Sequence, residues 1–316
     1  MAEDLQKQEF IGGNMSEKER YITACGCIKV LFLGTSNSGK TTLINGLIGD
    51  DILPECMCTS TKMTTYIGGS EDNINCISLF ELNSDRALEK LNWDDFVKYS
   101  SYRLEEIHSA TKSIESTKLA IIHSKHALSD LGICLVDTIG FGINQFDSEA
   151  TIKLVDEADI LVIVYDVSHT GGFTLDELNF LKKHIFKEKE NMFPLDRIII
   201  VPNKIDKVAS VSEVVEIAKK DLCNWVESNT PEWNMLVNSI CPISAYYYRL
   251  ARVGISNHII AGNRKIRYEL MNYDAETLIN ASLETGNYKQ TLFNKSKVGT
   301  LLELLTKKSF KYRMKK

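Results

Sequence analysis

A glycine-bounded stretch near the start of the chain has the residue types and spacing of a phosphate-binding loop. Residues 34–41, Gly-Thr-Ser-Asn-Ser-Gly-Lys-Thr, match the pattern G-x-x-x-x-G-K-[ST] in full. Its two glycines allow backbone angles that other residues resist, so the loop amides can point at phosphate oxygens. We expect the following residues to contact the nucleotide: Gly34, Ser36, Asn37, Ser38, Gly39, Lys40, Thr41 and Thr42.

The end of this loop supplies positive charge and a metal ligand. Lys40 can place its ammonium group across the outer phosphates, and the Thr41 hydroxyl is a typical Mg²⁺ ligand. A second Mg²⁺ ligand is predicted at Asp137, which opens the motif Asp-Thr-Ile-Gly. The amide of Gly140, at the end of that motif, can contact the γ-phosphate. Together the two motifs predict a nucleoside triphosphate bound with Mg²⁺.

A third motif, Asn-Lys-Ile-Asp, selects the base. Asp206 can accept hydrogen bonds from N1–H and the exocyclic amine of guanine, a donor pair that adenine lacks. Lys204 can lie over the base, and Asn203 can brace the phosphate loop. A later Ile-Ser-Ala, with Ser244 and Ala245, suits a backbone contact to guanine O6. The order of these motifs predicts GTP as the substrate and GDP as the bound product.

Composition narrows the class of protein. The 316 residues are 44% hydrophobic and 25% charged, which is ordinary for a globular protein, and the formal net charge is −5. That charge argues against a dedicated nucleic-acid binder. The polar N-terminus does not resemble a secretory signal, and no run of 18 apolar residues is present. We interpret the eight cysteines as reduced thiols of a cytoplasmic protein, in preference to metal ligands at Cys-Gly-Cys and Cys-Met-Cys.

Alternating strands and helices must position these motifs. Short apolar runs predict strands at 28–34, 118–124, 132–140, 158–168, 195–206 and 239–245, with 118–124 and 132–140 as neighbours. Helical patterns follow the phosphate loop and recur at 149–157, 174–188 and 211–228. Residues 84–116 are rich in helix formers and predict a helical insertion. This pattern predicts an α/β fold, with a mainly parallel central sheet flanked by helices.

The chain divides into three parts on this interpretation. Residues 1–27 form an N-terminal lead-in segment, and residues 28–250 form the nucleotide-binding domain. Residues 251–316 form a helical part that completes the domain, ending in a basic tail at 307–316. This tail could contact anionic lipid, although a solvated terminus is the simpler interpretation.

These motifs in this order resemble the translation-factor-related P-loop GTPases and, within that class, the dynamin-like large GTPases of the bacterial type. Residues 53–67, with Leu-Pro before a threonine-rich stretch, resemble the dynamin-type switch segment. Thr61 is the best match for its Mg²⁺-binding threonine, with Thr59 as the alternative. The stretch from Thr61 to Asp137 is far longer than in small GTPases, and dynamin-like domains carry an insertion there. The run at 126–142 is similar to the family's approach to its Asp-Thr-Pro-Gly motif, with Ile139 in place of the proline.

The resemblance also implies how hydrolysis proceeds. Small GTPases often orient water with a glutamine where this chain has Phe141, so another device is required. Lys40, the Thr61 backbone and Asn37 are the expected catalytic groups. Asn37 is similar to the asparagine of cation-activated GTPases, whose side-chain oxygen helps bind K⁺. The alternative is that Asn37 only forms hydrogen bonds within the loop.

Partners are implied by the same resemblance. We expect a GTP-dependent homodimer or a paired dynamin-like partner, with a possible peripheral contact to a membrane. Two alternatives are kept. One is a ribosome- or RNA-associated GTPase, although no basic RNA-binding module is visible in the sequence. The other is a GTP-binding scaffold with negligible hydrolysis.

Overall fold

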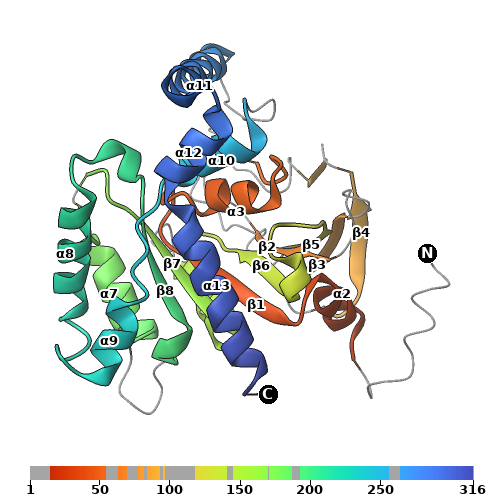
Figure 1. Ribbon diagram of the computed structural model, residues 1–316. Coiled ribbons are helices and arrows are strands. Elements are labelled where there is room, and N and C mark those ends of the chain that lie inside the picture. Colours follow the sequence, from red (N-terminus) through yellow and green to blue (C-terminus); the bar gives the residue numbers. More distant parts are fainter. Residues whose placement is uncertain are drawn as a thin grey trace.

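An eight-stranded sheet, counted over the described residues, runs in the order β4-β3-β5-β2-β6-β1-β7-β8 (Figure 1). The computed structural model describes residues 15–54, 63–69, 77–81, 84–92, 95–96, 118–140, 145–169, 171–186, 193–255 and 264–315. The strands are β1 (Ile28–Leu33), β2 (Thr64–Gly68), β3 (Ile77–Glu81), β4 (Ala87–Leu91), β5 (Lys118–His123), β6 (Ile133–Asp137), β7 (Ile160–Asp166) and β8 (Ile198–Asn203).

Helices cover both faces of this sheet. The α-helices of the described residues are α2 (Glu17–Cys25), α3 (Lys40–Ile48), α6 (Gln145–Glu157), α7 (Leu175–His184), α8 (Val211–Leu222), α9 (Pro231–Val237), α10 (Ala245–Val253), α11 (Arg264–Thr285), α12 (Tyr288–Ser296) and α13 (Val298–Arg313). Apolar side chains of α3, α10 and α13 form one core cluster against the sheet. Those of α2, α6, α7, α8 and α9 form a second cluster. The predicted α/β fold is therefore confirmed.

The centre of the sheet is parallel. Strand β1 pairs in parallel with β6 and β7, and β7 pairs in parallel with β8. These strands are almost fully buried apolar runs, as expected for strands covered by helices on both faces. In this register Phe32 lies opposite Asp137, and Asp166 lies opposite Asn203. The carboxyl ends of the central strands therefore bring three of the predicted motifs to one edge.

The outer half of the sheet differs from the prediction. Strand β2 is antiparallel to β6 and parallel to β5, so it separates two strands that were predicted to be neighbours. The prediction was wrong because strand order depends on contacts between distant segments. A segment at 64–68 can add to the edge of β6 and present its own free edge to β5.

Two further segments were assigned wrongly. Residues 87–91, inside the predicted helical insertion, form β4 antiparallel to β3, and pairing overrides the helix propensity of Ala-Leu-Glu-Lys-Leu. Most of the remaining insertion lies outside the described residues. Residues 239–245 form only isolated bridges, from Ile240 to Ile200 and from Ile243 to Asn203, and no full strand.

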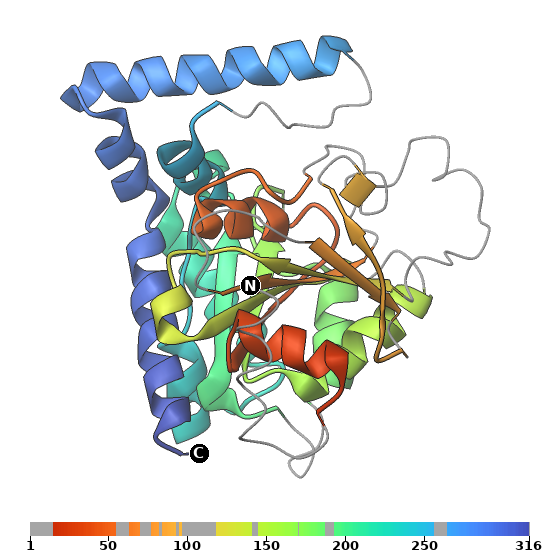
Figure 2. The ribbon, with the colours of Figure 1, turned by 90° about the vertical axis from the view of Figure 1, so that its right-hand side faces the viewer.

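The C-terminal helices differ in their contact with the sheet. Helix α13 packs along the domain, whereas α11 stands beyond α12, at the far end from α13 (Figures 1 and 2). Position 250 lies inside α10, so this boundary of the predicted division does not coincide with the end of an element. None of the helices built by the described residues combines the length and apolar character that crossing a bilayer requires.

The basic tail is largely part of α13. Lys311 and Lys315 form ion pairs with the Asp196 carboxylate at 3.0 and 2.8 Å, and Lys308 donates to the Asp196 carbonyl at 2.8 Å. Burial raises the pKa of the Asp196 carboxyl, but the two lysines outweigh it and hold the pKa at about 2. Arg313 also donates to the Leu131 carbonyl, so four of the tail's cations are engaged with the domain itself.

Candidate functional site

The phosphate loop joins β1 to α3, and its glycines are required by close contacts. A Cβ on Gly34 would lie 2.1 Å from the carbonyl oxygen of Val164, on β7. Gly39 has φ of 93°, and a Cβ there would lie 2.2 Å from Nδ2 of Asn203. Only glycine fits these two positions, because any side chain would push the loop away from the neighbouring strands.

Lys40 begins α3 and is a buried cation, 5% exposed. Its Nζ donates hydrogen bonds to the carbonyl oxygens of Gly34 and Thr35, both at 2.9 Å. Burial lowers the pKa of Lys40 to about 8, and the carboxylates of Asp137 and Glu177 partly oppose that change. A desolvated ammonium group held by neutral carbonyls is a strong point of attraction for an anion.

Thr41 and Asp137 meet at the predicted metal site. The Thr41 hydroxyl donates to the Asp137 carboxylate at 3.0 Å, and Asp137 is fully buried at the end of β6. A hydroxyl and a carboxylate are the hard oxygen ligands that Mg²⁺ prefers, so these residues fit this ion. Thr42, the next residue, is half-buried in the first turn of α3.

Gly140 lies against the phosphate loop. A Cβ on this residue would be 2.5 Å from the backbone nitrogen of Ser36, which leaves no room for a side chain. Thr138 fixes the approach, because its hydroxyl donates to the carbonyl of Phe32 on β1 at 2.7 Å. The Asp-Thr-Ile-Gly motif and the phosphate loop therefore pack directly against each other.

Asn203 connects the phosphate loop to the Ile-Ser-Ala segment. Its Nδ2 donates to the carbonyl of Ser38 at 2.8 Å, and its Oδ1 accepts from the amide of Ala245 at 2.9 Å. The residue is 1% exposed, so this bridge is shielded from water. The Ala245 amide, in the segment expected to make a backbone contact to guanine O6, is thus engaged with Asn203 in this structure.

Asp206 and Ser244 form a second link between these segments. The Ser244 hydroxyl donates to Asp206 at 2.5 Å and accepts from the Tyr247 amide at 3.1 Å as the N-cap of α10. Lys204 has φ of 69°, and its Nζ forms an ion pair with Asp166. Burial alone would raise the Asp166 pKa, but Lys204 and Ser168 bring it below its ordinary value.

The residues assigned to hydrolysis are less fully described. Asn37 is exposed and has φ of 63°, a left-handed conformation that asparagine tolerates better than most residues. Thr61, its alternative Thr59 and Phe141 lie outside the described residues. The structure thus brings together Lys40, Thr41, Asp137 and Asn203, while residues 55–62 of the switch segment lie outside the described residues.

The sequence analysis missed Glu177. This carboxylate is 2% exposed, and it accepts a hydrogen bond from the Thr35 hydroxyl at 2.7 Å. Thr174 and Glu177 have the spacing of a capping box, so the sequence could predict the start of α7. It could not predict that the same carboxylate reaches the phosphate loop.

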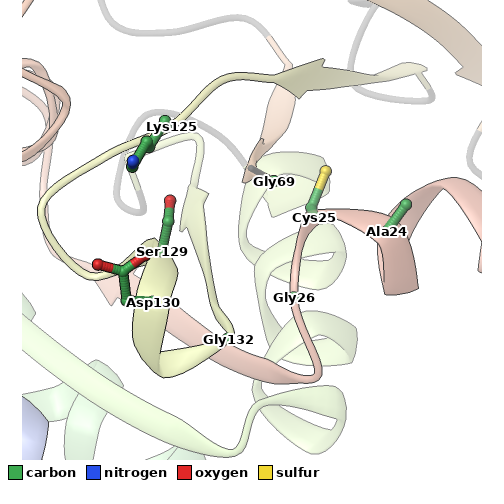
Figure 3. A pocket seen from close by; sticks show the side chains of 8 residues that line it. All are labelled: Ala24, Cys25, Gly26, Gly69, Lys125, Ser129, Asp130 and Gly132. Atoms are coloured by element: carbon green, nitrogen blue, oxygen red, sulfur yellow. The ribbon is translucent and has the colours of Figure 1, made fainter. Parts of the chain in front are cut away.

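A separate pocket lies at the opposite edge of the sheet. It has a volume of about 220 Å³ and includes Gly26 and Gly132, which precede β1 and β6. Figure 3 shows Lys125, Ser129 and Asp130 on one wall, with Ala24 and Cys25 across from them. The phosphate loop follows the other end of β1, so this pocket is not part of the candidate nucleotide site.

A family model supports the class of protein that this site defines. The model described as the dynamin family matches residues 30–205, more than half of the chain. The chain therefore belongs to the dynamin family, whose members are GTPases. The resemblance to dynamin-like GTPases of the bacterial type is confirmed.

Curated relatives agree over the same region. Transmembrane GTPase fzo-1 of Caenorhabditis elegans is 25% identical over 240 residues, covering 69% of this chain and 29% of its own length. A bacterial dynamin-like protein of Nostoc punctiforme is 25% identical over 206 residues, covering 58% of this chain and 28% of its own length. Mitofusin-2 of Rattus norvegicus is 23% identical over 193 residues, covering 61% of this chain and 24% of its own length. The chain thus spans less than a third of these relatives.

A solved structure shares the fold. It is an oligomerised bacterial dynamin pair, described as providing a mechanism for the long-range sensing and tethering of membranes. The match has a TM-score of 0.50 and 18% identity, and it covers 99% of this chain and 44% of that chain.

Proposed function

We propose that this chain binds GTP with Mg²⁺ at the phosphate loop and hydrolyses it. The observation that carries the proposal is the bridge made by Asn203 between Ser38 and Ala245. It joins the phosphate-binding and base-binding segments directly, before any ligand contributes. A scaffold role with negligible turnover would use the same bridge, so measured turnover distinguishes the two.

In this proposal each polar group has one task. Lys40 neutralises charge on the outer phosphates, and main-chain amides of the loop surround the phosphate oxygens. Thr41 and Asp137 would hold Mg²⁺, together with Thr61 from outside the described residues. The ion, when bound, neutralises charge on the phosphates. The backbone of Thr61 is proposed to orient the attacking water.

Selection of guanine is assigned to Asp206. Its carboxylate accepts one hydrogen bond from Ser244, which fixes its orientation and leaves acceptor capacity for N1–H and the exocyclic amine. Lys204 is proposed to cover the base. An asparagine at position 206 would present an N–H donor toward the C2 substituent, which matches the carbonyl of xanthine.

The test is calorimetry with Mg²⁺ and three nucleotides. Wild type should prefer GTP over ATP, whereas Asp206→Asn should lose at least about 100-fold in GTP affinity and gain affinity for xanthosine triphosphate. Asp176→Asn, at an exposed residue of α7, is the matched control and should behave as wild type. Equal binding of GTP and ATP by wild type would reject the assignment.

Cation-dependent, dimer-activated hydrolysis is the finer part of the proposal. Asn37 is exposed at the loop, where its side-chain oxygen can bind K⁺ or meet a second copy of the domain. We expect K⁺ to raise turnover over Na⁺, turnover to rise faster than linearly with protein concentration, and Asn37→Ala to abolish the K⁺ effect. Equal rates in both salts would leave Asn37 with a role inside the loop only.

Action with a partner at membranes is supported by the similarity in fold to the bacterial dynamin pair. Sedimentation with anionic vesicles, with and without GTP, tests it. Because Lys311 and Lys315 are engaged with the Asp196 carboxylate, we expect neutralising these two lysines to change vesicle binding little. Binding that requires only the tail would contradict this expectation.

A further inference from the structure

A buried carboxylate beneath the phosphate loop has no role in the function proposed above. Glu177 lies in the first turn of α7 and is 2% exposed. Its Oε2 accepts hydrogen bonds from the amide and the hydroxyl of Thr174, at 2.9 and 3.0 Å. Its Oε1 accepts from the Thr35 hydroxyl in the phosphate loop at 2.7 Å. The two oxygens therefore serve two different segments.

Capping of α7 explains only half of this arrangement. The Thr174 hydroxyl accepts from the Glu177 amide at 3.3 Å, and Oε2 completes a reciprocal capping box. The box would be equally satisfied by a neutral glutamine. A buried carboxylate is retained at low cost only when hydrogen bonds and local charge compensate it. The N-terminus of α7, the Thr35 hydroxyl and nearby Lys40 provide that compensation.

Thr35 connects Glu177 to the rest of the phosphate loop. Its carbonyl accepts from Lys40 Nζ at 2.9 Å and from the Ser38 amide at 3.3 Å. Gly140 packs on the same residue, since a Cβ there would lie 3.0 Å from the Thr35 carbonyl carbon. The side chain of Thr35 is thus fixed by α7, while its backbone fixes Lys40 and the turn of the loop.

We propose that Glu177 is a positioning residue for the phosphate loop, holding Thr35 so that the loop amides and Lys40 are ordered before the nucleotide arrives. The inference rests on the proposed binding of GTP by this loop. Its consequence is that the start of α7 and the phosphate site are coupled through one hydrogen bond. A ligand need not order the loop itself, so removing that hydrogen bond weakens binding.

The test combines two substitutions with two controls, using the full chain, GTP and Mg²⁺. Thr35→Val removes the hydroxyl at nearly constant volume and should weaken GTP affinity about tenfold, because the lost bond is to a charged group. Thr35→Ser keeps the hydroxyl and should stay within about twofold of wild type. Thr174→Ala breaks the cap but leaves the Thr35–Glu177 contact, so it should lower stability without changing GTP affinity.

The second substitution tests whether the two residues act together. Glu177→Gln preserves the capping box with its oxygen and turns its Nε2–H donor toward the Thr35 hydroxyl, which must then accept. It should weaken GTP affinity about threefold, because the resulting neutral bond is the weaker one. The double variant Thr35→Val, Glu177→Gln should bind GTP no more weakly than Thr35→Val alone. Full additivity of the two losses, or wild-type affinity in Thr35→Val, would overturn the inference.

Hydrogen exchange without nucleotide separates this inference from the proposed function. Amides in a peptide covering residues 34–41 should exchange faster in Thr35→Val and Glu177→Gln than in wild type, and unchanged in Thr35→Ser. If wild type bound no GTP, the proposed function would fail while faster exchange still supported the positioning role. Unchanged exchange in both variants of a GTP-binding protein would reject the positioning role alone.

Discussion

Two buried cations in this chain have opposite surroundings. Arg249 of α10 is 2% exposed, and its Nε and a terminal nitrogen donate to the two oxygens of Asp51 at 2.9 and 2.8 Å. Its other terminal nitrogen lies 3.6 Å from Asp274 of α11. Lys40 is almost as buried, yet the hydrogen bonds of its Nζ within the described part of the chain go to two neutral carbonyls.

This difference distinguishes a cation that stabilises the fold from a cation that is suited to bind a ligand. A buried guanidinium between carboxylates is compensated inside the fold, so it joins the segments that carry them: the exit of α3, α10 and α11. A buried ammonium on carbonyls keeps part of its charge uncompensated, and burial lowers its pKa to about 8. The first group is complete without a ligand, whereas the second is suited to receive an anion.

Breaking the compensated cluster should give the largest effect. Arg249→Met leaves Asp51 and Asp274 buried without their cation, so we expect a loss of about 3–5 kcal/mol in the free energy of unfolding. Urea denaturation measures it. The matched control adds Asp51→Asn and Asp274→Asn to the same variant and should recover part of the loss. A loss below about 1 kcal/mol in the single variant would show that the cluster is not a structural requirement.

Removing the partly compensated cation should act on binding more than on stability. Lys40→Met should weaken GTP affinity roughly 100-fold, because the outer phosphates lose their charged partner. Its free energy of unfolding without nucleotide should change far less than that of Arg249→Met, because the loss of a buried ammonium group offsets the loss of a cation near Asp137 and Glu177. Calorimetry and urea denaturation of the same sample check both. If Lys40→Met destabilised the chain as much as Arg249→Met, the contrast between the two cations would be lost.

A third buried ionisable group, His126, extends the comparison to the dependence of stability on pH. Its Nδ1 accepts from the Leu128 amide at 3.1 Å and its Nε2 donates to the Ile133 carbonyl at 3.0 Å, so the ring is neutral. Burial lowers the pKa of His126 to about 4, although the bond to Ile133 partly opposes this. The folded pKa lies below the unfolded value of about 6.5, so stability is full above that value and falls on acidification.

The expected loss from His126 is about 2 kcal/mol at pH 5 relative to pH 7. Urea denaturation at a series of pH values from 7 to 4.5 measures it. His126→Gln cannot take up the proton and should show a shallower dependence on pH over that range. Equal slopes in the two proteins would mean that other groups control acid stability.

An exposed ion pair should give the smallest effect. Lys295 and Glu284 join α12 to α11 with side chains that are 46% and 47% exposed. Solvent screening limits such pairs, so Glu284→Gln should change the free energy of unfolding by less than about 0.5 kcal/mol. Thermal unfolding at low and high salt checks it. A change comparable to that of Arg249→Met would mean that the contribution of an ion pair to stability does not depend on its burial.

Motifs that are short in sequence were predictable because their geometry is local. The loop from Gly34 to Thr41 carries its own turn glycines, its lysine and its hydroxyl, and α3 follows it as predicted. Helices α8 and α13 also follow their apolar patterns, although α8 ends at Leu222, before the predicted position 228. The order β5-β2-β6 and the strand at 87–91 were not predictable, because pairing between distant segments decides them.

The sequence by itself determined the chemistry available to this protein: a phosphate loop, an aspartate at the end of β6, and an Asn-Lys-Ile-Asp motif that starts at the last residue of β8. These motifs can be recognised in the sequence because each consists of residues close together along the chain. Only the tertiary structure decided which charges meet. It placed Glu177 under Thr35 and Asp51 against Arg249, pairs separated by 142 and 198 residues, through the packing of helices on a sheet. Contacts over such separations leave no local pattern, because many partners along the chain could form them equally well.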